Sequence, residues 1–434
     1  MSQLAKFYPA KRDPRLVGSL QRLTPWLLRW FYQVELVLST EPSVPLAILQ
    51  DHPCLLLCNH PTFVDPMVMF LLSGVVQRSF YYLAAHERFG GLEGWLFQRI
   101  GAYSIRRGQA DRDSIAYTLK LLTQTDCKLV IFPEGGCSFQ NDTVMPFRPG
   151  AIQMALQALS KIEDRDFYVV PISLKYRYTG QMTPIIEKTL RKLEQALQVL
   201  PQGGYYDRLR RVAAAVMQRF EQEYGLDYSA THPELTDWNQ RIIRLKSQVL
   251  SQCEQRLQLS ANPNEPNRER VYRIQRAIET RSLAGEKGEI AVNATGHQVN
   301  NKSDYNSPNH SGNHPGENLL AGGEDWEMMR RSLSRVLNFD AIYDGYVAER
   351  PTPERFLDTL TRLERAVFEI DQPSAKGYRQ AFLRIGQPVN LRQYRQVYQH
   401  DRTATVQDLT HQLQQTVQRN LNTLSEATAR DISW

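Results

Sequence analysis

The chain has 434 residues, of which 42% are hydrophobic and 23% charged, so it can bury a sizeable core and is not disordered throughout. Its net charge of +6 is concentrated at one end, because residues 1–30 carry six basic side chains against one acidic residue, Asp13. The remainder shows no basic stripe with interleaved aromatic residues, so we expect no nucleic-acid partner.

Five cysteines are too few for a disulfide scaffold in a chain of this length, and Cys54 and Cys58 lie inside an apolar run. They indicate buried thiols in a reducing compartment, which predicts a cytoplasmic location. No run of about 18 apolar residues predicts a membrane-spanning helix, and we expect no cleavable signal segment.

The basic segment 1–39 is predicted to be helical and amphipathic. Asp13-Pro14 and Thr24-Pro25 each resemble a helix N-cap followed by proline at the first helical position. Apolar residues then recur every three or four positions, at Leu16, Leu20, Leu23, Leu27, Phe31, Val34 and Leu38. Aromatic rings typical of membrane–water boundaries occur in the same segment, at Trp26, Trp30 and Tyr32. Two interpretations are open: a helix in the membrane interface with basic residues at anionic headgroups, or a helix packed on the core.

After residue 40, short apolar runs of strand length alternate with segments of helical spacing. The expected strands are 54–58, 80–83, 129–132 and 168–172, and the intervening helices are 66–77, 111–124 and 150–161. Apolar strands that alternate with helices predict an α/β fold with a mixed, partly parallel sheet flanked by helices. Ligands of such sheets bind at the carboxyl ends of the strands.

From 183 to 282 the sequence is helical and charged, and from about 285 to 323 polar residues, Gly and Pro replace the aliphatic ones, which predicts a flexible linker. Within this linker, His297, His310 and His314 leave a metal site as a minor alternative. Further elements are expected at 325–337 and 353–370 (helices), 382–386 (a strand) and 406–425 (an amphipathic helix).

Polar constellations follow three of the predicted strands. After the first strand, Asp65 stands five positions beyond His60, where a helix is expected to begin. A turn there can fold the carboxylate onto one imidazole nitrogen, which fixes the tautomer and leaves the other nitrogen as a base near neutral pH. Taken alone, this spacing also fits a structural histidine or a helix-capping aspartate.

The second constellation is Arg106-Arg107, whose forked donors suit a phosphate. The third is Glu134-Gly135-Gly136, where glycines permit a ligand to approach the backbone closely. Each constellation alone also fits a surface pair or an ordinary turn. Three of them at successive strand ends favour one shared site.

These residues resemble the blocks of the glycerophospholipid acyltransferase family, typified by 1-acylglycerol-3-phosphate acyltransferase. The matching blocks, in order, are His60 with Asp65, Gly101 to Arg107, Phe132 to Gly135, and Val169-Val170-Pro171. The segment 146–151, which contains Arg148, is similar to a basic-Gly-Ala segment of the family. The resemblance covers about residues 35–180.

Two features depart from the family pattern. Gly136-Cys137 stand where members commonly carry Thr-Arg, which removes a phosphate-binding arginine that Arg148 is positioned in sequence to replace. The closing apolar-Gly-x-Pro strand appears only at Ile385 to Pro388, about two hundred residues after the fourth block.

The resemblance implies transfer of an acyl group from acyl-CoA or acyl carrier protein to a hydroxyl of a glycerol-phosphate or lysophospholipid-type acceptor. It implies that His60 is the general base and that Asp65 orients it. The residues implied in acceptor binding are Arg106, Arg107, Glu134, Gly135, Gly136, Arg148 and Pro171. The resemblance implies neither a metal nor a cofactor besides the acyl thioester co-substrate.

The resemblance also favours the membrane interpretation of the N-terminal helices, because lysolipid acceptors and their products reside in bilayers. We therefore expect peripheral binding to a membrane surface. The predicted domains are an anchor at 1–39, an acyltransferase core at 40–180, a helical insertion at 181–375, and a strand and helix at 376–434 that complete the core.

Four alternatives remain open at this stage. The acceptor could be a lysolipid without a phosphate, or His60 and Asp65 could be ligands of a metal-dependent hydrolase. The insertion could be a docking platform on a core whose catalysis is vestigial. A covalent acyl-cysteine at Cys58 or Cys137 is less favoured, because base catalysis by His60 requires no protein nucleophile.

Overall fold

The structure is a computed structural model of the whole chain. It describes residues 6–39, 44–108, 110–162, 165–226, 237–262, 265–294, 322–339 and 343–429. The chain forms two compact units: Met1–Arg219 with Ala341–Trp434, and Phe220–Asp340.

The first unit is built on one mixed, mostly parallel sheet. Its strands are β1 (Val34–Leu38), β2 (Cys54–Cys58), β3 (Tyr81–Ala85), β4 (Ala102–Ile105), β5 (Lys128–Ile131), β6 (Tyr168–Tyr178), β7 (Arg379–Ile385) and β8 (Val389–Asn390). Their order is β1-β7-β6-β2-β5-β3-β4, with β8 paired to β6. Strands β7 and β8 pair antiparallel with β6, and β1 runs parallel to β7. Strands β2 to β6 are parallel to one another, so their carboxyl ends lie along one edge. This sheet confirms the predicted α/β class.

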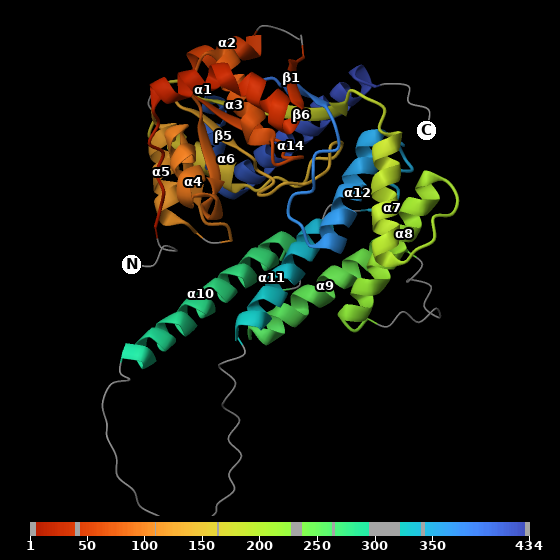
Figure 1. Cartoon of the computed structure of the whole chain (residues 1–434). Coiled ribbons are helices and arrows are strands. Elements are labelled where there is room, and N and C mark those ends of the chain that lie inside the picture. Colours follow the sequence, from red (N-terminus) through yellow and green to blue (C-terminus); the bar gives the residue numbers. More distant parts are fainter. Residues whose placement is uncertain are drawn as a thin grey trace, which may run out of the picture. The chain divides into compact units, whose positions relative to one another are not determined.

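Helices cover both faces of the sheet (Figure 1). They are α1 (Pro14–Leu27), α2 (Val44–Asp51), α3 (Asp65–Val76), α4 (Gly91–Arg99), α5 (Arg112–Leu122), α6 (Gly150–Leu159), α13 (Arg395–His400) and α14 (Arg402–Ala427). Strand β2 is buried on both sides and divides the core: Leu56 packs with side chains of α1 and α3, whereas Leu55 and Leu57 pack with side chains of α5, α6 and α14. A central strand of a sheet that helices cover on both faces needs apolar side chains on both of its sides, and β2 has them.

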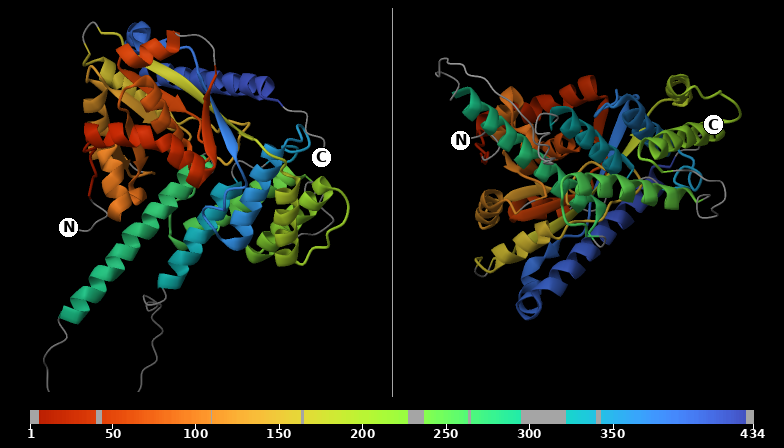
Figure 2. Two further views of the ribbon diagram at one scale, coloured as in Figure 1. Left: turned by 45° about the horizontal axis from the view of Figure 1, so that its top comes forward. Right: turned by 90° about the horizontal axis from the view of Figure 1, so that it is seen from below.

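The strand near the C-terminus joins the sheet next to the fourth family block. Ile172 to Tyr178 of β6 pair with Arg379 to Ile385 of β7, and β7 in turn pairs in parallel with β1. The left view of Figure 2 shows these three strands, yellow, blue and red, lying together. Pro171 lies between the β6 residues that pair with β8 and those that pair with β7, a position where a missing N–H is tolerated.

The N-terminal segment differs from the predicted pair of helices. Asp13 caps α1 and Pro14 is its first residue, as predicted, but Pro25 lies inside the helix, and the Thr24 hydroxyl donates to the Leu20 carbonyl. A π-helical turn, η2 (Leu28–Tyr32), ends the helix, and Val34–Leu38 form β1. The predicted helical face is therefore wrong beyond residue 32, because pairing with β7 overrides the local periodicity.

Six further helices follow β6: α7 (Thr183–Leu197), α8 (Tyr205–Glu223), α9 (Trp238–Arg256), α10 (Asn267–Ala294), α11 (Gly322–Phe339) and α12 (Pro353–Phe368). In the second unit, α9, α10 and α11 pack on one another. Residues 285–294, which the composition assigns to a flexible linker, instead continue α10. His297, His310 and His314 lie outside the described residues. The limits predicted for the four domains stay predictions.

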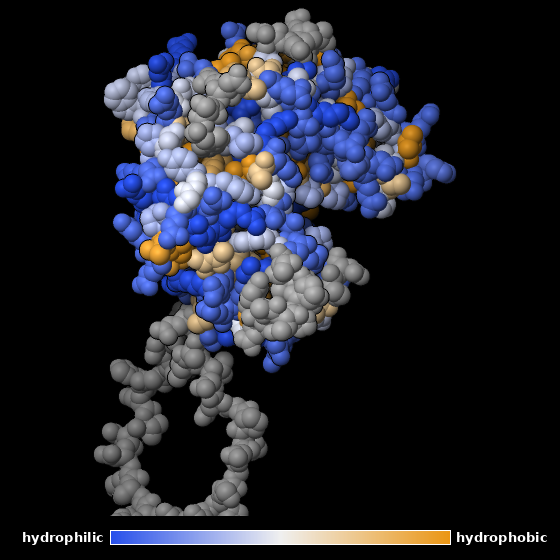
Figure 3. Space-filling view, turned by 90° about the vertical axis from the view of Figure 1, so that its right-hand side faces the viewer, coloured by the Kyte–Doolittle hydropathy of each residue, from blue (hydrophilic) through white to orange (hydrophobic). Residues whose placement is uncertain are grey.

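Among the residues that the structure describes, no helix is both long and apolar enough to cross a membrane. The face of the molecule in Figure 3 is mainly hydrophilic, and its apolar residues lie in small separate groups.

Candidate active site

His60 and Asp65 lie together at the carboxyl end of β2. The strand ends at Cys58, and the Asn59 side chain then bridges to β6 by two hydrogen bonds with the backbone of Leu174, at 2.7 and 3.0 Å. The following turn leads into α3, whose first residue is Asp65. Nδ1 of His60 is 2.7 Å from Oδ2 of Asp65. The Asp65 side chain is fully buried, whereas 14% of the His60 side chain is exposed.

Three further donors hold the Asp65 carboxylate in place. The Thr62 backbone N–H donates to Oδ2 at 2.8 Å, and the Thr62 hydroxyl donates to Oδ1 at 2.7 Å. The Tyr176 hydroxyl, which comes from β6, donates to Oδ1 at 2.6 Å. Because the carboxylate acts as an acceptor in each of these bonds, Nδ1 of His60 is the donor toward it, and Nε2 carries the lone pair.

Tyr176 is a site residue that the sequence patterns do not indicate. The residue is 111 positions from Asp65 and outside all four family blocks, and only the pairing of β2 with β6 brings it to the site. The side chain is buried, and burial together with the nearby charge of Asp65 raises the pKa of the Tyr176 hydroxyl well above its ordinary value. Tyr176 is therefore a neutral hydrogen-bond donor near neutral pH.

Glu134 fixes the backbone of His60. It follows β5, and Oε1 of its buried carboxylate accepts from the His60 N–H at 2.7 Å, while Oε2 accepts from the Met145 N–H at 3.3 Å. The Ser138 N–H in the same loop donates to the His60 carbonyl at 2.8 Å. The ring of Phe132 stacks on the imidazole at 4.3 Å between centroids. The third family block and Ser138 just after it therefore hold His60 through both backbone groups and the ring.

Gly135 lets Arg148 lie against the same loop. Gly135 has φ +75°, and a Cβ built on it would come within 2.6 Å of Nε of Arg148. Any larger residue would displace this guanidinium or strain the backbone. Gly136 continues the turn, beside Cys137. His60, Asp65, Glu134, Gly135 and Arg148 therefore form one connected group.

Arg106 and Arg107 stand apart from this group. They follow β4, the edge strand, and β5 and β3 lie between β4 and β2, a separation of about 14 Å at the usual strand spacing. Asp111 accepts from Nε and Nη2 of Arg106 at 3.1 and 2.8 Å, and this hydrogen bonding raises the pKa of Arg106. Nη2 of Arg107 is 3.5 Å from Oε1 of Glu87. Arg106 is thus held by a neighbouring carboxylate rather than presented to a ligand.

Pro171 lies in the middle of the sheet. It pairs with Leu57 of β2, and its carbonyl accepts from the N–H of Gly386 at 2.8 Å. A Cβ on Gly386 would come within 3.1 Å of this carbonyl oxygen, so the glycine permits β7 to approach β6 closely here. The family's fourth block and its displaced closing strand are therefore in contact.

Of the two cysteines near the site, Cys58 is buried and Cys137 is partly buried. Burial raises the pKa of Cys58 and of Cys137 well above the ordinary value for a thiol, and the charge of Asp65 raises both further. A thiolate nucleophile is therefore disfavoured at both positions. Within the described ranges, no group of three or more His, Cys, Asp or Glu side chains is arranged to hold a metal ion.

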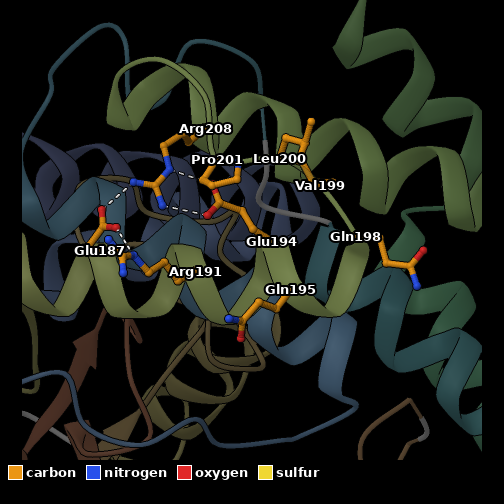
Figure 4. A pocket seen from close by; sticks show the side chains of 9 residues that line it. All are labelled: Glu187, Arg191, Glu194, Gln195, Gln198, Val199, Leu200, Pro201 and Arg208. Atoms are coloured by element: carbon orange, nitrogen blue, oxygen red, sulfur yellow. Dashed lines mark hydrogen bonds and ion pairs between the residues drawn. The ribbon is translucent and has the colours of Figure 1, made fainter.

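A separate cavity of about 590 Å³ lies on the helices that follow β6 (Figure 4). Arg208 of α8 donates to Glu194 of α7 from Nε and Nη2, at 2.7 and 2.8 Å, and its Nη1 is 2.5 Å from Glu187. The hydrogen bonds to Glu194 are the main cause of a raised pKa of Arg208. None of the predicted site residues lines this cavity.

A buried strand thus places a histidine–aspartate pair at the carboxyl edge of an α/β sheet. Residues 41–175 match the family described as Acyltransferase, which supports the resemblance of this segment to the glycerophospholipid acyltransferases.

Two curated proteins are similar to this segment. One is a 1-acyl-sn-glycerol-3-phosphate acyltransferase of Streptococcus pneumoniae, 30% identical over 135 residues, which are 31% of this chain and 44% of that protein. The other is a lyso-ornithine lipid O-acyltransferase of Pseudomonas aeruginosa, 28% identical over 160 residues, which are 37% of this chain and 56% of that protein. The chain spans about half the length of these relatives.

Proposed function

We propose that this protein transfers an acyl group from an acyl thioester, acyl-CoA or acyl carrier protein, to a hydroxyl of a glycerol-phosphate or lysophospholipid-type acceptor. A 1-acylglycerol 3-phosphate is the first acceptor to test. The proposal depends on one observation, the 2.7 Å contact of Nδ1 of His60 with a buried carboxylate that three other donors hold in place.

In the proposed reaction, Nε2 of His60 takes the proton of the acceptor hydroxyl as its oxygen attacks the thioester carbonyl carbon. The C–S bond then breaks, the thiolate leaves and takes the proton back from the imidazolium, and an ester and a thiol are formed. Asp65 orients the ring and stabilises its charged form. Base catalysis of this kind typically contributes about 10²–10⁴ in rate.

The remaining predicted residues have unequal support for acceptor binding. Arg148 lies against Gly135, beside the loop that holds His60, and is the best-supported cation of the predicted set. Arg107 is at the distant edge strand, and Arg106 is paired with Asp111. Glu134, Gly136 and Pro171 would form no bonds to the acceptor. They would shape its pocket by holding the backbone at the carboxyl edge of the sheet.

An acyl-transfer panel tests the proposal. Acyl-CoA and acyl carrier protein would each be paired with glycerol 3-phosphate, lysophosphatidate, a neutral lysolipid and a lyso-ornithine lipid. The last acceptor is included because one relative is named for it. We expect His60→Ala and Asp65→Ala to lower turnover by about 10³ or more while the protein stays folded. The matched control is His411→Ala on the exposed surface of α14. Near-wild-type turnover in the His60 variant would contradict the mechanism.

We also propose that the end of α1 and η2 contacts the membrane that holds the acceptor. Trp26, Trp30 and Phe31 are 59, 68 and 67% exposed, and the two indole rings stack at 5.9 Å. Arg22 and Arg29 are exposed on the same segment. Exposed indole rings beside arginines suit an interface with anionic headgroups. The opposite side of α1 packs on the core through Val17, so both interpretations of this helix have support.

A further inference from the structure

One face of α12 follows the loop that holds His60. Arg355, Asp358, Arg362 and Arg365 lie on this face, at spacings of three and four residues. We refer to these four side chains as the polar face of α12. The helix lies outside the segment 41–175 that matches the acyltransferase family, so nothing in the family blocks predicts its presence at the site.

Each member of the polar face meets a residue between Ser138 and Asp142. Nε of Arg355 is 2.6 Å from Oδ2 of Asp142, and Oδ2 of Asp358 accepts from the Asn141 N–H at 2.9 Å. Nη2 of Arg362 donates to the Ser138 carbonyl. The guanidinium of Arg365 lies over the Phe139 ring, 4.3 Å from its centroid. The helix therefore lies along the loop 138–142 and contacts four of its five residues.

Charges buried in this way are a weak source of stability, because the desolvation of each ion offsets much of its attraction to a partner. They do fix the position of the loop, and this loop carries Ser138, whose N–H donates to the His60 carbonyl at 2.8 Å. The polar face of α12 therefore positions His60 indirectly, through the backbone of this loop. Nε of Arg365, at the end of the face, donates to the Asp371 carbonyl at 2.9 Å, outside the loop 138–142.

Arg365 lies instead against Phe139, the residue after Ser138 in the loop that holds His60. Its partner Phe139 has φ +50°, a strained conformation for a residue with a large side chain. Phe139 also meets Phe63 edge-on, with centroids 5.1 Å apart, and Phe63 is three residues from His60 and 41% exposed. Strain of this kind is typical of functional sites.

The charge of Arg365 also reaches the Cys137 thiol. Burial raises the pKa of this thiol, the charge of Asp65 raises it further, and the charge of Arg365 lowers it. Both charges therefore lie within electrostatic range of one sulfur atom. A guanidinium stacked on a ring can still form forked hydrogen bonds in its own plane.

We propose that Arg365 of α12 binds the anionic group of the lipid acceptor, with Phe63 and Phe139 contacting the adjoining hydrocarbon. The assignment rests on the proposed acyl-transfer function, because that function supplies the acceptor. An anionic group fits here because Arg365 brings a positive charge to the loop that holds His60. Cys137 of this loop stands where the family commonly carries an arginine, and it contributes no positive charge. A phosphate and a carboxylate share this chemistry.

Equilibrium binding tests the assignment separately from catalysis. In a His60→Ala background, the dissociation constants of short-chain lysophosphatidate, lyso-ornithine lipid and monoacylglycerol would be measured with and without Arg365→Gln. We expect the affinity for at least one of the two charged lipids to fall by about tenfold, with less than a twofold change for monoacylglycerol. Which charged lipid loses affinity identifies the phosphate or the carboxylate.

The matched control is Arg335→Gln in the second unit, where the guanidinium lies 4.5 Å over Phe220. It removes the same kind of cation–π contact, and we expect no change in any of the three affinities. Arg365→Lys should restore part of the affinity for the charged lipid, which separates lost charge from a disturbed fold. Equal losses for charged and neutral lipids, or no loss for any of them, would overturn the assignment. If the wild type transfers no acyl group but charged lipids still depend on Arg365, the proposed function fails and the binding site stands.

Discussion

The hydroxyl of Tyr176 in β6 donates a hydrogen bond at 2.6 Å to Oδ1 of Asp65, the first residue of the helix that follows the neighbouring strand β2. The bond joins residues far apart in sequence, and it leaves Oδ2 of the same carboxylate for the imidazole of His60 and for the Thr62 N–H. The guanidinium of Arg379 in β7 lies over the Tyr176 ring at 4.9 Å. The C-terminal strand therefore borders the residue that braces the candidate catalytic pair.

Removing the Tyr176 hydroxyl tests this bracing. We expect Tyr176→Phe to lower kcat/KM of acyl transfer by about tenfold to a hundredfold, because a hydrogen bond to an ionised group contributes about 1.5–3 kcal/mol. The control is Tyr178→Phe, two residues along the same strand and beside the same Arg379. A variant of Tyr176 that matches the control in kcat/KM and in its pH profile would show that the bond has no role in catalysis.

The exposed indole pair gives a prediction about membranes. We expect the double variant Trp26→Ser with Trp30→Ser to bind vesicles that contain phosphatidylglycerol at least about a hundredfold more weakly, since each buried indole contributes about 1.5–3 kcal/mol and the variant removes two. Vesicle co-sedimentation measures the loss. Deleting residues 1–38 would be unsuitable because it removes β1 from the sheet.

The control for the indole pair is Leu200→Ser, which removes an apolar side chain that is 68% exposed elsewhere on the first unit. Equal vesicle binding by the double variant and the wild type would contradict contact through this segment. Raising the salt concentration should weaken binding of the wild type, because the arginines contribute through screened charge.

Gly135 gives a prediction about the loop. We expect Gly135→Ala to destabilise the protein by about 1–2 kcal/mol, because φ is positive and the new Cβ would collide with Arg148. Turnover should fall as well, since Arg148 is displaced. Gly150→Ala is the control, as nothing lies within 4 Å of the Cβ it would add. Denaturant unfolding and turnover of both variants check the prediction, and identical results for the two would refute it.

Asp358 gives a prediction about pH. Burial raises the pKa of this carboxyl to about 6, although the Asn141 N–H and the Arg362 charge oppose the rise. The folded chain therefore keeps a proton that the unfolded chain releases between about pH 4 and 6. The contribution of the Asp358 carboxyl to the free energy of unfolding is therefore present below about pH 4 and is lost as the pH rises through 6.

We therefore expect Asp358→Asn to gain stability relative to wild type by about 2 kcal/mol between pH 4 and 7, a figure reduced from the full linkage value because the side chain is partly exposed. Denaturant unfolding of both proteins at the two pH values measures the difference. Thr359→Val on the next position of α12 serves as the control for substitution in this helix. A stability difference that does not change with pH would contradict the raised pKa.

Local sequence determined the elements whose physics is local. The apolar run 54–58 was predictable as a strand because it is uniformly apolar, and Asp13-Pro14 as a helix start because capping involves neighbouring residues. The proximity of His60 and Asp65 was predictable for the same reason, since a five-residue turn limits how far apart they can lie.

Tertiary structure decided what depends on distant partners. Val34–Leu38 have helical spacing but form β1, because β7 supplies a parallel edge that only the folded sheet presents. The pairing of β2 with β6 brings Tyr176 to Asp65, and α12 brings Arg365 to Phe139 from more than two hundred residues away. Sequence periodicity reports which side of an element is apolar, whereas the choice of partner follows from how the whole chain buries its apolar faces and satisfies its buried hydrogen bonds.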